Sequence, residues 1–406
     1  MDYIMRDLLV KSNYDVVIIS RYNPWEGGGL ENMVQKQVTS LLDAGLRVAV
    51  FFRKRAKKEK LPHEVTCYTV NDFLSRFSGA LADIIYAVPT YLKVAKIDTK
   101  VVLDNFELPF LYIIFKKPKK HVKIIKVHHG TPNYLTSYKG YKGVLAKIYM
   151  LFLKPFYSMS SKKVDLNIAV SHKIKKELII DYRVPKEKII VILNGVDIDR
   201  FIPRNKLLIR KQLKIPLKKK IVMFLGGDYE RKGLHEALNI IELLRNNNSN
   251  IMLLVISSKE VKNDRKWVKV FHSVSNHQLP LLYNISDIFL LPSKYEVGLP
   301  LAAIESISSG CPVVLSTVAA EEGNIGEGYL VAHNFSQYIA FCRELIENEG
   351  YWNEMSLSGR ALAIRKYNEE EQFASYLENI TTIASINKKL KSNNSDYSET
   401  IKNSIN

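Results

Sequence analysis

The stretch YDVVIISRYNPWEGGGLENMVQKQVTSLLDAGLRVAVFF, residues 14–52, decides the fold class. It opens with an apolar run of strand length, and a glycine-rich turn follows at 27–29. Apolar residues then recur at helical spacing, at Leu30, Met33, Val34, Val38, Leu41 and Leu42. Gly45 ends this helix, and RVAVFF (47–52) is the next strand. A strand, a helix and a strand in this order predict a parallel, doubly wound sheet.

The same alternation continues along most of the chain. Strands of a first set are predicted at 101–104, 122–129 and 165–170, and 189–197 is predicted to be a further strand with its exit loop. Strands of a second set are predicted at 220–227, 251–256, 267–271, 287–292 and 312–316. A helix over 171–181 begins at Ser171, a residue type that caps helices. The sequence therefore predicts an α/β protein with two doubly wound, Rossmann-like parallel-sheet domains that face a central cleft.

The domain boundaries follow from this division. We place the first domain at residues 1–202 and the second at 203–366, where a segment with two prolines and a lysine run begins. A helix at 367–387 could cross back to the first domain, and the polar tail at 388–406 is expected to be disordered. Ligands of such sheets bind at the carboxyl ends of the strands, so the site is expected in the cleft.

The charge of the chain is strongly basic and unevenly distributed. Residues 1–200 hold 34 Lys and Arg against 19 Asp and Glu, whereas residues 201–406 hold 25 against 22. This asymmetry favours an anionic partner for the first half, either membrane headgroups or nucleic acid. No groove-reading or base-stacking motif accompanies the charge, so nucleic acid is not expected. A lysine-rich composition with no partner remains the alternative.

The prediction of cellular location rests on three patterns that the sequence lacks: a disulfide framework, a signal peptide and a long apolar run. Its three cysteines, Cys67, Cys311 and Cys342, have no metal-site spacing and suggest no disulfide framework. The start of the chain does not have the pattern of a signal peptide, and no run of about 20 apolar residues is present. A cytoplasmic protein, peripheral on the inner face of the cell membrane, is the expectation.

Two glycine-rich turns follow predicted strands, EGGGLE (26–31) and GGDYERKGL (226–234). Glycine lets backbone N–H groups approach a ligand, and the start of a helix favours an anion. The second turn adds two cations, Arg231 and Lys232, and this combination suits a diphosphate. The first turn could equally be a simple turn.

Two glutamates stand in KYEVGLPLAAIESISSGCP, residues 294–312. Gly298, Leu299 and a proline mark a helix start, and Glu305 lies two turns into that largely apolar helix. A carboxylate in such a place needs donors, and paired sugar hydroxyls would serve. The alternative is that Glu305 bonds only groups of its own domain. Glu296, in the loop before the helix, could meet another hydroxyl.

Two adjacent histidines end the strand predicted at 122–129. Neighbouring residues on a strand face opposite ways, so His128 and His129 do not both reach one small site. His129 is favoured as the functional residue because it directly precedes the glycine at which the backbone turns. A structural role remains open for either.

Five motifs in order resemble those of the GT-B glycosyltransferases of family 4, the retaining, nucleotide-sugar-dependent kind. They are EGGGLE, HHGT (128–131), DLNIAV to NGVDIDRF (165–201), FLGGDYERKGL (224–234) and LPSKYEVGLPLAAIESISSGCPVV (291–314). The resemblance spans nearly all of residues 14–366. It implies a GT-B fold with an acceptor-side first domain and a second domain that binds the nucleotide-sugar donor.

The resemblance also implies a role for each matching residue. Gly28 and Gly29 would lie under the donor diphosphate, and His129 would face the transferred sugar. Arg231 and Lys232 would hold the diphosphate and stabilise the leaving group. Glu305 would accept the ribose hydroxyls and Glu296 would contact the sugar. Three further residues belong to the donor-binding motifs: Gly227, Gly298 and Leu299.

The sequence departs from the family pattern in two places. Gly227 stands where the family commonly has an arginine, for which Arg231 could compensate. The family spaces its glutamates eight positions apart, whereas Glu296 and Glu305 are nine apart, so Val297 holds the expected place. Either the loop bulges to bring Glu296 in, or the sugar contact is lost.

No metal or other cofactor is expected, because cations at the diphosphate can stabilise the leaving group. The segment Asp197 to Asp199 has the form of a metal-binding DxD motif. We interpret it instead as part of the turn between the domains. The nucleotide sugar is a substrate, with a UDP- or GDP-sugar expected.

The predicted function is a hexosyltransferase-type glycosyltransferase that acts with retention on a lipid-linked or envelope glycan acceptor. Basic and apolar residues mix in 110–123 and 147–163, which favours contact with an anionic membrane surface, although a core with a solvated lysine face is the alternative. The shifted glutamates leave open a non-catalytic GT-B subunit that supports a partner transferase. A sugar-nucleotide epimerase or a phosphorylase is a further alternative.

Overall fold

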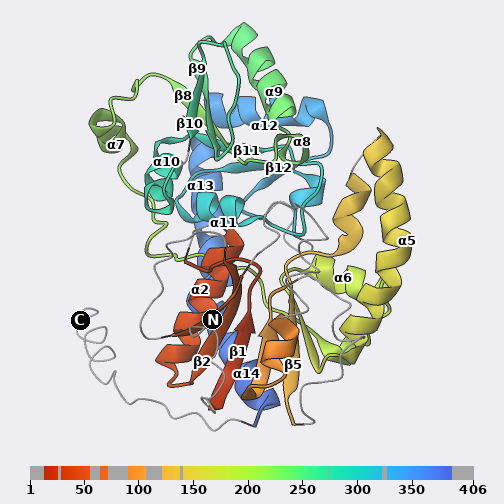
Figure 1. Cartoon of the computed structure of the whole chain (residues 1–406). Coiled ribbons are helices and arrows are strands. Elements are labelled where there is room, and N and C mark those ends of the chain that lie inside the picture. The colour runs from red at the N-terminus through yellow and green to blue at the C-terminus, as the bar shows by residue number, and fades with distance from the viewer. Residues whose placement is uncertain are drawn as a thin grey trace, which may run out of the picture. The chain divides into compact units, whose positions relative to one another are not determined.

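The computed structural model describes residues 13–25, 29–54, 65–71, 90–106, 121–137, 140–272, 274–321 and 327–385 (Figure 1). They form two compact units. Unit 1 comprises the described residues of Met1–Val127, Lys163–Leu166 and Phe373–Asn406, and unit 2 comprises those of His128–Lys162 and Asn167–Gln372. The limits of these two units do not test the predicted domain boundary at residue 202, so that boundary stays a prediction. The tail predicted to be disordered, 388–406, lies outside the described residues.

The first sheet has seven parallel strands in the order β3-β2-β1-β4-β5-β6-β7. Its strands are β1 (Asn13–Ile19), β2 (Val48–Lys54), β3 (Thr66–Asn71), β4 (Asp98–Asp104), β5 (Lys123–His128), β6 (Leu166–Ala169) and β7 (Ile189–Val191). Together with α2 (Gly29–Asp43), β1 and β2 confirm the strand-helix-strand unit with which the chain opens. Sequence patterning missed β3, a six-residue strand at the sheet edge.

Unit 1 is held by an apolar core that α2 helps to build. Met33, Val34, Val38 and Leu41 of α2 are buried, as the helical spacing predicted. Gly45 takes φ +78° just beyond the helix, a conformation that glycine adopts readily. Helix α14 (Glu369–Ile383) begins in unit 2 and continues into unit 1. There Phe373, Tyr376 and Ile380 of α14 lie beside Gln37 and Leu41 of α2.

Unit 2 contains a long helix and a short capped helix before its own sheet. Helix α5 spans Gly140–Lys163 and α6 spans His172–Ile180, followed by the 3-10 turn η3 (Lys186–Lys188). The side chain of Ser171 accepts a hydrogen bond from the backbone N–H of Ile174 at 3.1 Å. This confirms the predicted cap of α6. Within the described residues, no helix combines the length and the apolar character needed to cross a membrane.

The second sheet has six parallel strands in the order β10-β9-β8-β11-β12-β13. The strands are β8 (Lys220–Leu225), β9 (Ile251–Ser257), β10 (Val268–His272), β11 (Ile288–Leu291), β12 (Val313–Ser316) and β13 (Leu330–Ala332). In sequence order this is the 3-2-1-4-5-6 arrangement of dinucleotide-binding folds. Two parallel sheets with interleaved helices confirm the predicted fold class.

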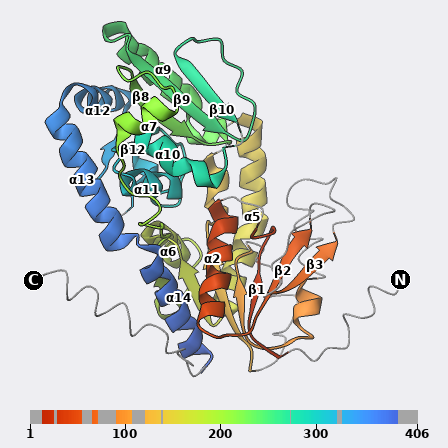
Figure 2. The same ribbon diagram turned by 90° about the vertical axis from the view of Figure 1, so that its left-hand side faces the viewer.

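Helices cover both faces of this sheet (Figure 2). Neighbouring strand residues alternate between two cores, so Val222 and Phe224 lie in one and Met223 in the other. The first core is completed by α9 (Leu234–Asn247) and α12 (Phe335–Glu347). The second is completed by α10 (Leu279–Ile285), α11 (Leu301–Ser308) and α13 (Glu349–Lys366). Burial on both faces explains why these strands are continuous apolar runs.

A buried ion pair ties the segment that enters the second sheet to its strands. Arg210 of α7 (Lys206–Gln212) is 3% exposed, and its Nη2 lies 2.7 Å from Oδ2 of Asp287. Asp287 also accepts from the Lys206 ammonium at 2.9 Å and from the backbone N–H of Ile221 at 2.7 Å. Burial alone would raise the pKa of Asp287, but the charges of Lys206 and Arg210 outweigh it and hold that pKa below its ordinary value.

We predict that Asp287→Ala lowers the free energy of unfolding at pH 7 by about 3–5 kcal/mol, because it leaves the buried guanidinium of Arg210 without its carboxylate. A carboxyl whose pKa is lowered on folding stabilises the protein above its unfolded pKa and loses that effect as the pH falls through its folded value. The difference between wild type and variant should therefore shrink below about pH 4. Urea unfolding at pH 7 and at a pH below about 4 measures this difference in the free energy of unfolding, and the exposed Asp264→Ala variant is the control. An equal difference at both pH values would contradict the ion-pair assignment.

Candidate functional site

The candidate site lies where β8 and β11 stand side by side in the second sheet. This is the point at which the strand order reverses, and the carboxyl ends of such strands bind ligands. The loops after the two strands touch: the backbone N–H of Lys294 donates to the carbonyl of Arg231 at 2.8 Å. Gly233, with φ +79°, lies so close that a Cβ there would stand 2.1 Å from the carbonyl oxygen of Pro292. A glycine is therefore required at the contact of the two loops.

A buried carboxylate gathers the two predicted cations. Glu296 is 6% exposed, and its Oε1 accepts from Lys232 Nζ at 2.6 Å and from Arg231 Nη1 at 3.1 Å. The hydroxyl of Ser293 donates to the same oxygen at 2.8 Å. Burial lowers the pKa of Lys232, and the charge of Glu296 opposes this shift. The structure thus brings together three of the four predicted catalytic residues.

The short helix α8 (Tyr229–Lys232) presents these cations from the glycine turn. Asp228 caps it, accepting from the backbone N–H of Arg231 at 3.3 Å and from Arg231 Nε at 3.2 Å. Gly226 leaves room for the Lys232 side chain, because a Cβ there would lie 2.9 Å from Cγ of that lysine. A Cβ at Gly227 would lie 3.0 Å from Oγ of Ser258. The loop is therefore bare backbone beside two cations, which is the chemistry that a diphosphate requires.

The glutamate loop places Glu296, not Val297, against the cations. Gly298 follows with φ +121°, and a Cβ there would meet Oε2 of Glu321 at 2.4 Å and Cβ of Ser171 at 2.6 Å. Leu299 is buried in the core below. The nine-residue spacing thus still delivers a carboxylate to the cluster, while contact of Glu296 with a sugar stays a prediction.

Glu305 has a partner that the sequence did not reveal. The hydroxyl of Tyr283 in α10 donates to Oε2 of Glu305 at 2.9 Å. Burial, together with the charge of Glu305, raises the pKa of Tyr283 well above its usual range, so the phenol remains a donor. Side-chain bonding within the domain, the alternative to a ribose contact, is therefore present. Ribose binding by Glu305 stays a prediction.

The two histidines have different surroundings. Buried His128 lies 2.5 Å through Nδ1 from the Tyr157 hydroxyl and 2.8 Å through Nε2 from Oδ1 of Asn167. The amide nitrogen of Asn167 donates to the carbonyls of Ser161 and Lys188, so Oδ1 must accept from His128. This gives His128 a structural role. Burial lowers the pKa of His129 to about 4, which keeps that ring neutral at pH 7.

Two predicted segments remain: the first glycine-rich turn and the DxD-like segment. Gly29 is the first residue of α2 in unit 1, and Gly28 lies outside the described residues. The roles of both under a diphosphate stay predictions. In the DxD-like segment, Oδ1 of Asp197 accepts from the backbone N–H groups of Asp199 and Arg200 at 3.2 and 2.9 Å. It therefore closes a local turn, while our interpretation of the segment as part of the turn between the domains stays a prediction.

Sequence reasoning missed Ser293, Tyr283, Lys173 and Glu321. Nζ of Lys173 donates to the backbone carbonyl of Glu296 at 2.5 Å, and Oε1 of Glu321 accepts from the backbone N–H and Nδ1 of His172 at 2.8 and 2.9 Å. Lys173 and Glu321 are each more than 120 positions from their partners, which a local pattern cannot connect. Two of the four stood within motifs: Lys173 in 165–201, and Ser293 in 291–314, three residues before Glu296.

Comparison with known proteins identifies the class to which this fold and site belong. The family described as Glycosyltransferase Family 4 matches residues 27–200, and that described as Glycosyl transferases group 1 matches residues 205–356. The chain belongs to the GT-B glycosyltransferases of family 4, as its motifs predicted.

Individual relatives are distant. The Escherichia coli UDP-Gal:alpha-D-GlcNAc-diphosphoundecaprenol alpha-1,3-galactosyltransferase is 25% identical over 316 residues, which are 69% of this chain and 78% of that protein. The chain spans 62%, 47% and 58% of the length of three other curated relatives. They are an uncharacterized 41.2 kDa protein in the cps region of Klebsiella pneumoniae, a putative teichuronic acid biosynthesis glycosyltransferase of Bacillus subtilis and a capsular polysaccharide biosynthesis glycosyltransferase of Staphylococcus aureus.

Solved structures show the same fold. Sucrose-phosphate synthase from Thermosynechococcus elongatus superposes with a TM-score of 0.78 at 15% identity, covering 92% of this chain and 100% of that one. Anabaena HepE in complex with UDP-glucose gives a TM-score of 0.71 at 12% identity, with 91% and 100% covered.

We predict that Gly233→Ala disrupts the site, because its Cβ would collide with the carbonyl of Pro292 and its backbone conformation is one that alanine rarely adopts. The expected loss in the free energy of unfolding is about 2 kcal/mol or more. Thermal and urea unfolding measure it. Gly350→Ala, near the start of α13 with no atom closer than 3.4 Å to its added Cβ, is the matched control and should be neutral or stabilising. Equal stability of the two variants would contradict the close contact of the loops.

Proposed function

We propose that this protein transfers a hexosyl unit from a nucleotide-sugar donor to a lipid-linked or envelope glycan acceptor, with retention of anomeric configuration. One observation carries the proposal: Arg231 and Lys232 converge beside a bare glycine loop at the switch point of a dinucleotide-type sheet. Family membership supports the reaction class.

The chemistry follows from where charge develops. Departure of a nucleoside diphosphate places negative charge on the phosphate and positive charge at the anomeric carbon. Lys232 and Arg231 would stabilise the first of these without a metal. Their charges are held in place by Glu296, so little reorganisation is needed when the donor binds. His129 would stand by the transferred sugar as a neutral ring, and Glu305 would accept the ribose hydroxyls.

Two relatives support the choice of substrates. The Escherichia coli relative is named as using UDP-Gal and a diphosphoundecaprenol-linked acceptor, and the Anabaena structure contains UDP-glucose. By analogy we propose a UDP- or GDP-sugar as donor and a lipid-linked saccharide as acceptor.

The test is nucleotide release from a panel of UDP-, GDP- and ADP-sugars, with a membrane lipid extract as acceptor. Wild type should release nucleotide from one donor, with or without EDTA. Lys232→Ala should lower kcat/KM about 100-fold or more, because it removes a cation from the leaving group. Glu305→Gln should raise the donor KM about tenfold through a weakened charged hydrogen bond. The exposed Lys266→Ala is the matched control.

Other outcomes of this panel would point to the alternatives. Release from no donor, by a folded protein that shows no thermal shift with any nucleotide, would favour a non-catalytic subunit. Conversion of a donor into its epimer without release of nucleotide would favour an epimerase. Release that stops in EDTA would contradict the metal-independent mechanism.

An exposed apolar face on α5 supports membrane contact. Val144, Ile148, Leu151, Phe152 and Met159 recur at positions that share one side of the helix, with exposures of 47–73%. Tyr157 and Ser160, on the opposite side, are buried. Lysines flank the exposed face, at Lys147, Lys154, Lys162 and Lys163. We propose that this face, with the basic charge of the first half, contacts an anionic membrane surface.

We predict that the protein co-sediments with vesicles containing about 30% phosphatidylglycerol, and less with neutral vesicles or at high salt. The double variant Leu151→Gln, Phe152→Gln should weaken binding about tenfold or more, because two large apolar side chains no longer enter the interface. Leu357→Gln on α13, with the same 73% exposure as Leu151, is the control. Equal binding of the double variant and the control would contradict this surface.

A further inference from the structure

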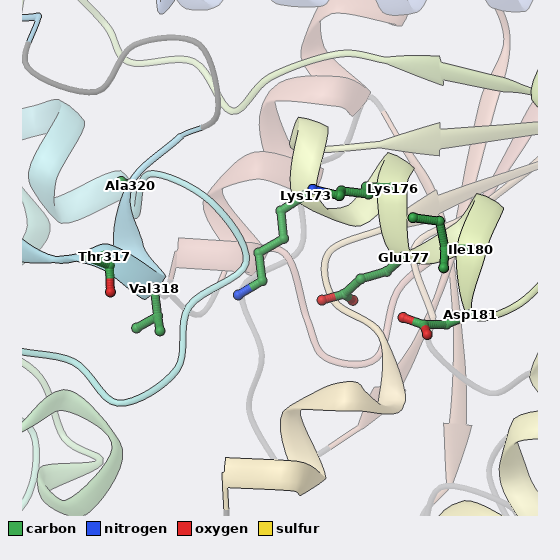
Figure 3. Close-up of a pocket in the computed structure, with 8 residues that line it drawn as sticks. All are labelled: Lys173, Lys176, Glu177, Ile180, Asp181, Thr317, Val318 and Ala320. Carbon is green, nitrogen blue, oxygen red and sulfur yellow. The ribbon is translucent and has the colours of Figure 1, made fainter. Parts of the chain in front are cut away.

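A pocket of about 460 Å³ lies between α6 and the loop after β12 in unit 2 (Figure 3). Lys173, Lys176 and Glu177 of α6 and Asp181, which directly follows that helix, form one wall, and Thr317 and Val318 form the other. The volume falls within the range of small-molecule sites. No residue of the candidate diphosphate site lines this pocket.

The α6 wall is a single helical stripe. Residues 173, 176, 177, 180 and 181 have the spacing of one face, while Ile174 and Leu178 on the other face are buried. The stripe is anchored at its start, because Ser171 caps the helix and Glu321 accepts from the backbone N–H of His172. The side chains that face the pocket therefore project from a fixed helix.

Both pocket carboxylates are held by residues in or just after the histidine motif. Glu177 accepts from the hydroxyl of Thr131, and Oδ2 of Asp181 accepts from the amide of Asn133 at 3.0 Å. The hydroxyl of Tyr182 donates to the amide oxygen of Asn133 at 2.9 Å, which fixes its orientation. A carboxylate offers about four acceptor positions, so these bonds orient Glu177 and Asp181 without filling them.

The pocket adjoins the candidate diphosphate site. Lys173 at its edge donates to the backbone carbonyl of Glu296, and its ammonium lies 4.6 Å from the centre of the Tyr295 ring. Thr131, which holds Glu177, is two residues from His129. A molecule in the pocket would therefore stand near both the leaving group and the residue expected to face the transferred sugar.

We propose that this pocket binds the accepting saccharide, with sugar hydroxyls donating to Glu177 and Asp181. Two lysines balance two carboxylates in the lining, and Lys154, outside it, pairs with Asp181 at 3.8 Å, so the lining itself has no net charge that would select an anion. Val318 and Ile180 supply apolar surface for the C–H face of a pyranose. The assignment rests on the proposed function and names the acceptor class for it: an uncharged glycosyl unit.

The test uses the full-length protein and octyl glycosides of glucose, galactose, mannose and N-acetylglucosamine, with binding measured by saturation-transfer NMR titration. At least one glycoside should bind wild type. Asp181→Asn, which keeps an oxygen for Asn133, should weaken that binding about tenfold or more through loss of a charged acceptor. Val318→Trp, which fills the pocket, should abolish it. Asp264→Asn is the matched control and should bind as wild type does.

Nucleotide binding, read as a thermal shift, is followed in every variant to separate the two proposals. Unchanged nucleotide binding with lost glycoside binding supports the pocket. Absence of glycoside binding to wild type, or equal binding by Asp181→Asn, Val318→Trp and the control, would overturn it while nucleotide binding leaves the proposed function intact. If the wild-type protein binds a glycoside but no nucleotide, and the variants lose glycoside binding, the saccharide site is supported and the donor assignment is contradicted.

Discussion

The buried carboxylate of Glu296 is the constraint around which the site of unit 2 is organised. A charge that is 6% exposed is costly unless cations and donors surround it, and Lys232, Arg231 and Ser293 meet this need. The same contacts hold the loop after β8 against the loop after β11. The cations therefore stand in place before any ligand arrives, and an incoming diphosphate would meet a preorganised site.

The parallel sheet makes this meeting possible. Strands β8 and β11 are neighbours although more than 60 residues separate them, so their carboxyl ends deliver two loops to one point. The loop after β12 supplies Glu321, which holds the start of α6, and α6 in turn supplies Lys173 to the backbone of Glu296. A continuous chain of contacts thus runs from the candidate diphosphate site to the candidate acceptor pocket.

Local patterns predicted most of the fold and the central pieces of the site. The strand-helix-strand unit at 14–52, the Ser171 cap and the cations at Arg231 and Lys232 are all encoded within short windows. Partner choice was not predictable in this way. Tyr283 for Glu305, Asn167 for His128 and Glu321 for His172 depend on how distant segments pack. Strand β3 (TCYTVN) mixes polar with apolar residues and β13 has only three residues, so neither stood out as an apolar run.

The spacing of the two glutamates shows most clearly how far the sequence alone can predict the site. Counting positions placed Val297 where a carboxylate was expected, whereas in the structure Glu296, two residues before the positive-φ Gly298, contacts the cations. The central claim is that this cluster holds a diphosphate, and calorimetric titration of nucleosides and their diphosphates tests it directly. We predict that one diphosphate binds about 100-fold or more tightly than its nucleoside, and that Lys232→Ala removes most of this preference. Equal affinity of the nucleoside and the diphosphate for the wild-type protein would contradict it.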